Sequence, residues 1–172
     1  EPLVYRLRPH FLMGECDNWY VYDGDNHIEY ENEAMLTMIY NQGYRESYLN
    51  NIFDGSRGSQ DGTQLVDDSG TLRFGSYSNG SHIDDYNFSG IIKQAVLISE
   101  ALSSEDVNSI YQSNGENIES YNPAAWYRFD KGSGNILFDY SGNRNHATIY
   151  GATWVEMDDV TGCTDELACE GS

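Results

Sequence analysis

Paired carboxylates near residue 30 are the first place where this chain could carry chemistry. Glu29 and Glu31 flank Tyr30, so on a strand the two acids would share one face. A retaining glycoside hydrolase needs two carboxylates about 5–5.5 Å apart, and alternate strand positions can supply them. A solvated strand face explains the same pattern. The chain also lacks a Ser–His–Asp pattern, a nucleophile elbow and a phosphate loop, so we predict that it is not an enzyme.

Aromatic side chains beside polar groups are the second source of chemistry, because sugar rings can stack on aromatic faces. The chain has 14 tyrosines, some within charged or polar segments. The alternative is that these aromatics form strands and core, for which their shape suits them equally. The candidate ligand-binding residues are Tyr44, Arg45, Tyr48, Tyr77 and Tyr86.

The charge balance excludes two classes of partner. The chain has 28 acidic and 9 basic residues, a net charge of −19. So negative a surface repels phosphate backbones and anionic lipid, and we expect neither nucleic acid nor membrane as a partner. No apolar run approaches the roughly 20 residues that a membrane span needs.

Three cysteines bear on the compartment. Cys163 and Cys169 stand in an acidic tail, residues 158–172, without the histidine pattern of a zinc site. We expect these two to form a small disulfide loop in an exported protein, and Cys16 to remain a single buried thiol.

The elements that must position these residues are mostly strands. The apolar run 35–40 predicts a buried central strand, and the turn 41–43 precedes a strand over 48–53 that Asp54 and Gly55 close. A long polar loop follows over 56–70. One short helix is expected over 104–111, with Ser103 as its N-cap, Asp106 completing a capping box, and Leu102 packing on Val107.

Two segments carry a family resemblance. Residues 124–154 contain W-Y-x-F-D-x-G-S-G, then D-x-S-G-N-x-N-H-A-T-I and G-A-T-W. This pattern resembles the opening strands of the laminin-G-like branch of concanavalin A-like jelly rolls. Upstream, F-x-G-x-I, an eight-residue strand, A-L-S-x-E-x-V and I-Y resemble the closing segment of the same family. The closing segment (71–112) thus precedes the opening one (124–156), in permuted order.

The resemblance implies an all-β, two-sheet antiparallel jelly-roll sandwich with one short helix. We expect a single module over 1–157, in which 125–129 pairs with the closing strand 91–98, within one chain or across a swapped dimer. The closing strand is rich in Ile, Val and Leu and needs hydrogen-bonded neighbours. A polar linker over 113–123 is expected between the two segments. The alternative to a single module is a domain boundary near Asn122.

The resemblance also implies a calcium-associated loop built on Asp139, Asn143 and Asn145. Calcium takes hard oxygen ligands such as carboxylates and turn carbonyls. Lys93 stands where many relatives carry a second acid, and Asp84 and Asp85 in the adjoining loop could replace it. The alternative is that Asp139 and Asn143 only cap turns.

The expected function is a non-catalytic extracellular module that recognises glycan or glycoprotein beside neighbouring domains of a larger secreted or surface protein. A structural adhesion or spacer module that contacts only protein is the alternative, and the remnant of a glycoside hydrolase is a more distant one.

Overall fold

The computed structural model describes residues 6–7, 10–15, 18–23, 28–29, 33–58, 62, 72–77 and 86–156, with side chains from residue 33 onward except at 77, 86 and 87. In this part of the chain the strands pair antiparallel and there is one α-helix, so the all-β prediction is confirmed. The strands are β1 (Arg6–Leu7), β2 (His10–Glu15), β3 (Asn18–Asp23), β4 (Ile28–Glu29), β5 (Leu36–Asn41), β6 (Tyr44–Leu49), β7 (Ile52–Arg57), β8 (Ser76–Tyr77), β9 (Tyr86–Asn87), β10 (Ala95–Leu97), β11 (Ala125–Tyr127), β12 (Ile136–Leu137) and β13 (Ala147–Thr148).

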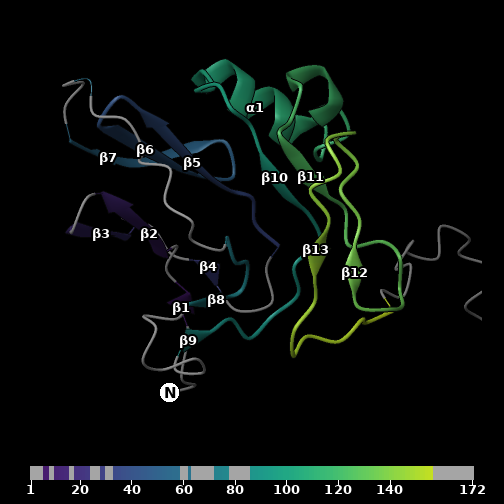
Figure 1. Ribbon diagram of the computed structural model, residues 1–172. Helices are drawn as coiled ribbons and strands as arrows, with labels where there is room; N and C mark the ends of the chain where they lie inside the picture. The colour runs from purple at the N-terminus through teal and green to yellow at the C-terminus, as the bar shows by residue number, and fades with distance from the viewer. Residues whose placement is uncertain are drawn as a thin grey trace, which may run out of the picture.

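The described strands form small sheets. β5, β6 and β7 make a three-stranded sheet in that order, and the pairs are β1–β4, β2–β3, β8–β9, β10–β11 and β12–β13. In Figure 1, α1 lies at the same end of the molecule as the β5–β6–β7 sheet, whereas β12 and β13 lie beyond the lower ends of β10 and β11. None of the helices in the described ranges is long and apolar enough to cross a membrane.

The β5–β6–β7 sheet departs from the sequence prediction. The turn between β5 and β6 is Gln42-Gly43, with φ of 50° and 97°, as a hairpin of the primed type requires. The expected single strand 48–53 is wrong: Asn50, at φ 59°, and Asn51 form a turn that separates β6 from β7. Asp54 and Gly55 lie inside β7, where the register shifts, instead of closing a strand. The prediction of a buried central strand over 35–40 is also wrong, because β6 is the central strand of this sheet. Among the described strands β5 pairs only with β6, and Ile39 is its one buried residue.

The predicted helix is α1 (Ser104–Gln112), one residue longer than expected. The Ser103 side chain accepts from the backbone N–H of Asp106, and the Asp106 carboxylate accepts from the backbone N–H of Ser103, which confirms the capping box. Val107 is fully buried against Ile39 and Tyr48. Burial of one such aliphatic side chain contributes about 1.5–3 kcal/mol, so α1 is held by the face of the β5–β6–β7 sheet.

The predicted pairing of 125–129 with the closing strand is confirmed within one chain. β10 and β11 are antiparallel, with Ala95 opposite Tyr127 and Leu97 opposite Ala125. The segment before β11 differs from the expected polar linker, because it contains a 3₁₀ helix, η1 (Ile118–Tyr121), whose Ile118 is buried. The described residues thus bring segments far apart in sequence into one pair of strands.

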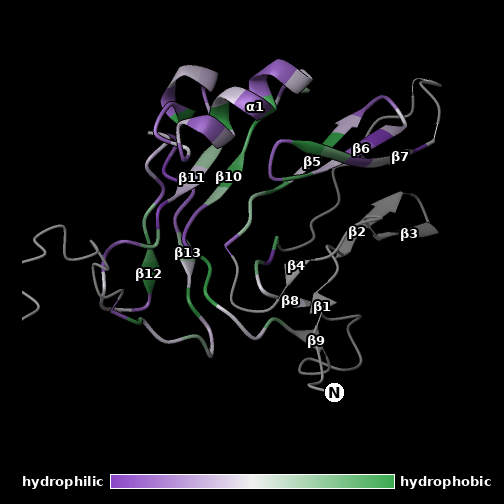
Figure 2. Cartoon of the chain, turned by 180° about the vertical axis from the view of Figure 1, so that it is seen from behind, coloured by the Kyte–Doolittle hydropathy of each residue, from purple (hydrophilic) through white to green (hydrophobic). Residues whose placement is uncertain are grey.

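A second buried cluster lies around β11. Ala125, Tyr127 and Leu137 form its centre, and Trp154 packs against it. A bridge between Tyr127 and Asp139 joins β11 to the segment that follows β12. Figure 2 shows the hydrophobic colour on β10 and β12, and more hydrophilic colour on α1 and the turns. This second cluster therefore holds residues from both ends of the segment 125–154 together.

Candidate functional site

The predicted ligand residues on β6 fall into different environments. Tyr44 is half-buried, whereas Arg45 and Tyr48 are buried, with 8% and 7% of their surface exposed. Tyr48 belongs to the core cluster with Ile39 and Val107, and its ring meets that of Phe53 edge-on at 5.7 Å. The Arg45 guanidinium lies 5.7 Å from the centre of the Tyr40 ring. Neither Arg45 nor Tyr48 forms an exposed platform, which corrects the expectation for these two residues.

The remaining candidates are described only in part. Tyr77 and Tyr86 are direct partners in the β8–β9 pair. Of Glu29 only the backbone of β4 is described. The predictions for Glu31, Asp84, Asp85, Cys16, Cys163 and Cys169 fall outside the described residues.

Asp139 is the hub of the loop that follows β12. Its Oδ1 accepts from the backbone N–H groups of Trp126 and Ser141, both at 2.9 Å. Its Oδ2 accepts from the backbone N–H of Asn145 at 2.9 Å and from the Ser141 hydroxyl at 2.8 Å. A carboxylate has about four acceptor positions, and these four bonds use them all.

The protonation of Asp139 reflects these bonds. Burial of the carboxyl opposes ionisation, but the donors from Trp126, Ser141 and Asn145 outweigh it and lower the pKa of Asp139 to about 2. Asp139 is therefore ionised at neutral pH, and four hydrogen-bond donors stabilise its negative charge.

The two asparagines of the predicted calcium loop bind the start of β11. The Asn143 side-chain amide donates to the carbonyls of Pro123 and Ala124, and that of Asn145 donates to Ala124 O at 2.9 Å. The bond from Ser141 N–H to Asp139 matches the alternative in which Asp139 caps a turn, whereas the Asn143 amide reaches carbonyls of a distant segment instead of capping a turn. Within the described ranges no group of three or more His, Cys, Asp or Glu side chains could hold a metal ion. Calcium binding stays a prediction.

An exposed surface that sequence reasoning missed lies on the outer side of β11. We call it the aromatic–charged surface; its exposed members are Arg128, Asp130, Lys131, Phe138 and Tyr140, and the half-buried Trp126 and Trp154 border it. Alternation along β11 points Trp126 and Arg128 away from the buried Tyr127, and that alternation was the only sequence signal for it. The backbone N–H of Tyr140 donates to Trp126 O at 2.7 Å and so brings a third side chain beside the first two.

Arg128 is the centre of this surface. Its guanidinium lies 5.6 Å from the centre of the Trp126 ring and 5.4 Å from that of Tyr140. The Arg128 Nε is 3.2 Å from an Asp130 oxygen, and the Tyr140 hydroxyl donates to the other Asp130 oxygen at 3.2 Å. This bond is the main reason why the pKa of Tyr140 is raised. Arg128, Asp130 and Tyr140 thus each have a partner that fixes their position, whereas the buried indole N–H of Trp126 has no hydrogen-bond partner in the described part of the chain.

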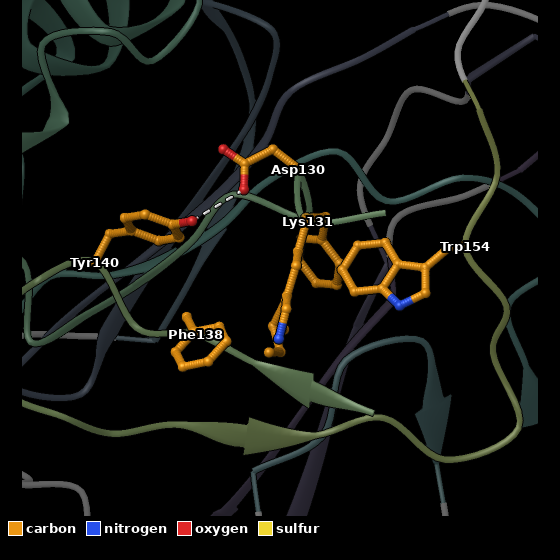
Figure 3. A pocket seen from close by; sticks show the side chains of 7 residues that line it. Asp130, Lys131, Phe138, Tyr140 and Trp154 are labelled. Atoms are coloured by element: carbon orange, nitrogen blue, oxygen red, sulfur yellow. Dashed lines mark hydrogen bonds between the residues drawn. The ribbon is translucent and has the colours of Figure 1, made fainter. Parts of the chain in front are cut away.

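A shallow hollow marks the other end of the surface. Its volume is about 10 Å³, less than one water molecule occupies in the liquid, so a ligand would lie across it and not inside it. Figure 3 shows the Tyr140 hydroxyl pointing at Asp130, and Lys131 extended beside Phe138. The Lys131 Nζ lies 4.3 Å from the centre of the Phe138 ring, and the Trp154 indole N–H donates to Gly134 O at 2.7 Å.

Comparison of the chain with protein-family models, with curated proteins and with solved structures found no match. The resemblance to laminin-G-like modules therefore rests on the sequence patterns described above.

Proposed function

We propose that the chain is a non-catalytic binding module of a larger extracellular or cell-surface protein, and that it recognises glycan through the aromatic–charged surface. The observation that carries the proposal is the exposed Tyr140 ring, with 47% of its surface accessible, which lies beside Trp126, has Arg128 over one face and has Asp130 bonded to its hydroxyl. Aromatic faces bind the apolar faces of sugar rings, and fixed charged groups can bind their hydroxyls.

The exposed rings of this surface suit a ligand that lies across it. The hollow below it is too small for a whole sugar, whereas Tyr140 and Phe138 are exposed next to it. The same stretch is electrically balanced, because residues 124–156 contain three basic and three acidic side chains in a chain of net charge −19. An uncharged or weakly charged glycan would therefore meet little repulsion there.

The fold part of the proposal is a laminin-G-like jelly roll in which residues 124–156 complete the module that 71–112 closes. The antiparallel β10–β11 pair supports it, since these strands belong to the closing and opening segments. The buried cluster of Ala125, Tyr127 and Leu137 supports it further, because Ala95 from the closing segment packs against that cluster.

A glycan array run with the wild type and two variants tests the function. Wild type should bind a defined set of glycans, Tyr140→Ala should lose about tenfold or more in affinity for them, and Tyr150→Ala should bind as wild type. Tyr150 is a suitable control because it is a tyrosine of the same segment with 87% of its surface exposed. If Tyr140→Ala and Tyr150→Ala bind all glycans equally, the aromatic–charged surface is not the binding site.

A protein-contacting adhesion or spacer module is the second candidate, and exposed apolar side chains favour it. Ile52 and Phe53 on β7 are 65% and 50% exposed, and Leu72 and Ile91 are 57% and 56% exposed. Apolar side chains that lie together on a surface mark protein contacts, so this candidate requires that some of these four belong to one patch. An array with no glycan bound by wild type, together with pull-down of a partner that Ile52→Ser abolishes, would favour this candidate over the first.

A further inference from the structure

A larger hollow lies between the β5–β6 hairpin and the residues that lead into α1. Its volume is about 220 Å³, enough for roughly seven waters at about 30 Å³ each. We call it the Tyr44 hollow; it is lined by Ile39, Asn41, Tyr44, Glu46, Leu102 and Ser103. It is separate from the aromatic–charged surface, whose small hollow has none of these residues.

Strand register explains why these side chains meet. Asn41 is opposite Tyr44, and Ile39 is opposite Glu46, so the four side chains share one face of the sheet. Arg45 lies between Tyr44 and Glu46 in sequence and so points to the opposite face, over the Tyr40 ring. Among the residues that line the Tyr44 hollow there is one carboxylate and no cationic side chain.

The lining combines an apolar floor with one charged group. Ile39 and Leu102 supply aliphatic surface, Tyr44 supplies an aromatic ring, and Glu46 supplies the carboxylate. The Tyr48 hydroxyl donates to the Glu46 Oε2 at 3.4 Å, so a residue of the buried core helps to orient that carboxylate. An aliphatic stem with a compact positive head matches this arrangement, because the stem can lie on Ile39 and Leu102 while the head meets Glu46 and the ring of Tyr44.

The N-terminus of α1 is close by and would by itself favour an anion. Here the capping box already satisfies it: Ser103 and Asp106 bind each other's backbone N–H groups. Two acidic side chains, Glu105 and Asp106, stand in the first turn of α1. Together with the net charge of −19, they make the field around the hollow negative, which attracts cations.

From this geometry we propose that the Tyr44 hollow binds an alkylammonium group, supplied by a free aliphatic amine or by a lysine side chain of a partner. Glu46 binds the ammonium, Tyr44 stacks beside it, and Tyr48 is a positioning residue for Glu46. The proposal goes beyond glycan binding and does not rest on it.

The test is a titration of the full chain, followed by ¹⁵N–¹H correlation spectra at low salt. Pentylammonium chloride should shift the amide signals of Ile39, Tyr44 and Glu46, and pentanol, its neutral counterpart, should not. Glu46→Gln keeps the shape of the side chain and should weaken pentylammonium binding about tenfold or more. Glu119→Gln removes one exposed carboxylate beyond the other end of α1 and should bind as wild type.

Two further variants and one more probe complete the test. Tyr44→Ala should also weaken binding, while Tyr48→Phe should weaken it less than Glu46→Gln does. Nα-acetyl-lysine methylamide distinguishes the two sources of the alkylammonium group. If it shifts the same amide signals, the hollow can bind a partner's lysine; if pentylammonium alone shifts them, the ligand is a free amine. Equal shifts with pentanol, or wild-type affinity in a folded Glu46→Gln variant, would overturn the proposal.

Discussion

Replacement of Asp139 by asparagine is the sharpest perturbation of the loop that holds β11. Asparagine keeps the size of the side chain, but it carries no charge and places an NH₂ group where one carboxylate oxygen accepts two hydrogen bonds. Whichever way the amide turns, a donor then faces two donors, either Trp126 N–H and Ser141 N–H or Asn145 N–H and the Ser141 hydroxyl. The substitution therefore removes the charge and half of the bonds together.

The expected loss can be worked from the pKa. The fall from 3.8 to about 2 in the pKa of Asp139 corresponds to roughly 2.4 kcal/mol at 1.36 kcal/mol per unit, and solvent screening at the turn reduces it to about 1–2 kcal/mol. Buried donors left without acceptors add about 1 kcal/mol or more. We expect Asp139→Asn to lower the free energy of unfolding by about 2–3 kcal/mol.

Urea denaturation followed by circular dichroism measures this loss. The control is Asp130→Asn, the same chemical change at a side chain that is 43% exposed and pairs with Arg128 on the surface. Such a surface pair contributes at most about 1 kcal/mol. If Asp139→Asn and Asp130→Asn shift the midpoint equally, the hydrogen bonds of Asp139 do not stabilise the fold and our reasoning fails.

The pH dependence of the free energy of unfolding gives a second measurement on Asp139→Asn. Between pH 4 and pH 2 the unfolded chain takes up a proton at residue 139 while the folded chain does not, so the contribution of Asp139 to stability falls as pH falls. The difference between wild type and Asp139→Asn should therefore shrink over that range. A constant difference from pH 6 to pH 2 would show that the low pKa of Asp139 does not contribute.

Three further predictions test the helix, the module boundary and calcium. Ser103→Ala removes the N-cap of α1 and should cost about 1 kcal/mol in urea denaturation, whereas Ser104→Ala should cost less. Truncation after Asn122 removes β11 and the second buried cluster, so the shortened chain should aggregate or lose cooperative melting; unchanged melting would support a domain boundary there. If calcium binds at the Asp139 loop, the melting temperature should be higher in excess calcium than in chelator, since binding to the folded state alone stabilises it by about 2.7 kcal/mol at a hundredfold excess over the dissociation constant. An unchanged melting temperature would reject the predicted calcium site.

Local chemistry explains what could be predicted from the sequence. The helix was predicted to within one residue because the bonds of its capping box join residues only three apart. The β10–β11 pair was predicted because its two strands carried recognisable patterns and the closing strand needed a neighbour. In both cases a short sequence pattern marked the residues that make the contact.

The misses had causes that lie outside any local segment. Asp54-Gly55 is a strong turn signal, yet the pair lies in a strand because the register of β7 shifts there, while Asn50-Asn51 makes the turn. Tyr44 and Tyr48 share a face of β6, and only the position of Val107 on α1 decides that Tyr48 is core. The aromatic–charged surface escaped prediction because Tyr140 joins Trp126 through a contact across strands, which no spacing along the chain reveals.

The same carboxylate links the stability of the loop to the geometry of the proposed binding surface. Asp139 accepts from Trp126 N–H, and the next residue, Tyr140, donates its own N–H back to Trp126 O. These two bonds fix the backbone positions of the rings that stand 6.3 Å apart with Arg128 against both. Asp139→Asn should therefore weaken glycan binding and stability together, whereas Tyr140→Ala should weaken binding while leaving the Asp139 bonds in place. If both variants are fully folded and lose glycan binding equally, the surface binds glycan through its aromatic rings. If Asp139→Asn alone loses binding, the loop that follows β12 is the binding element.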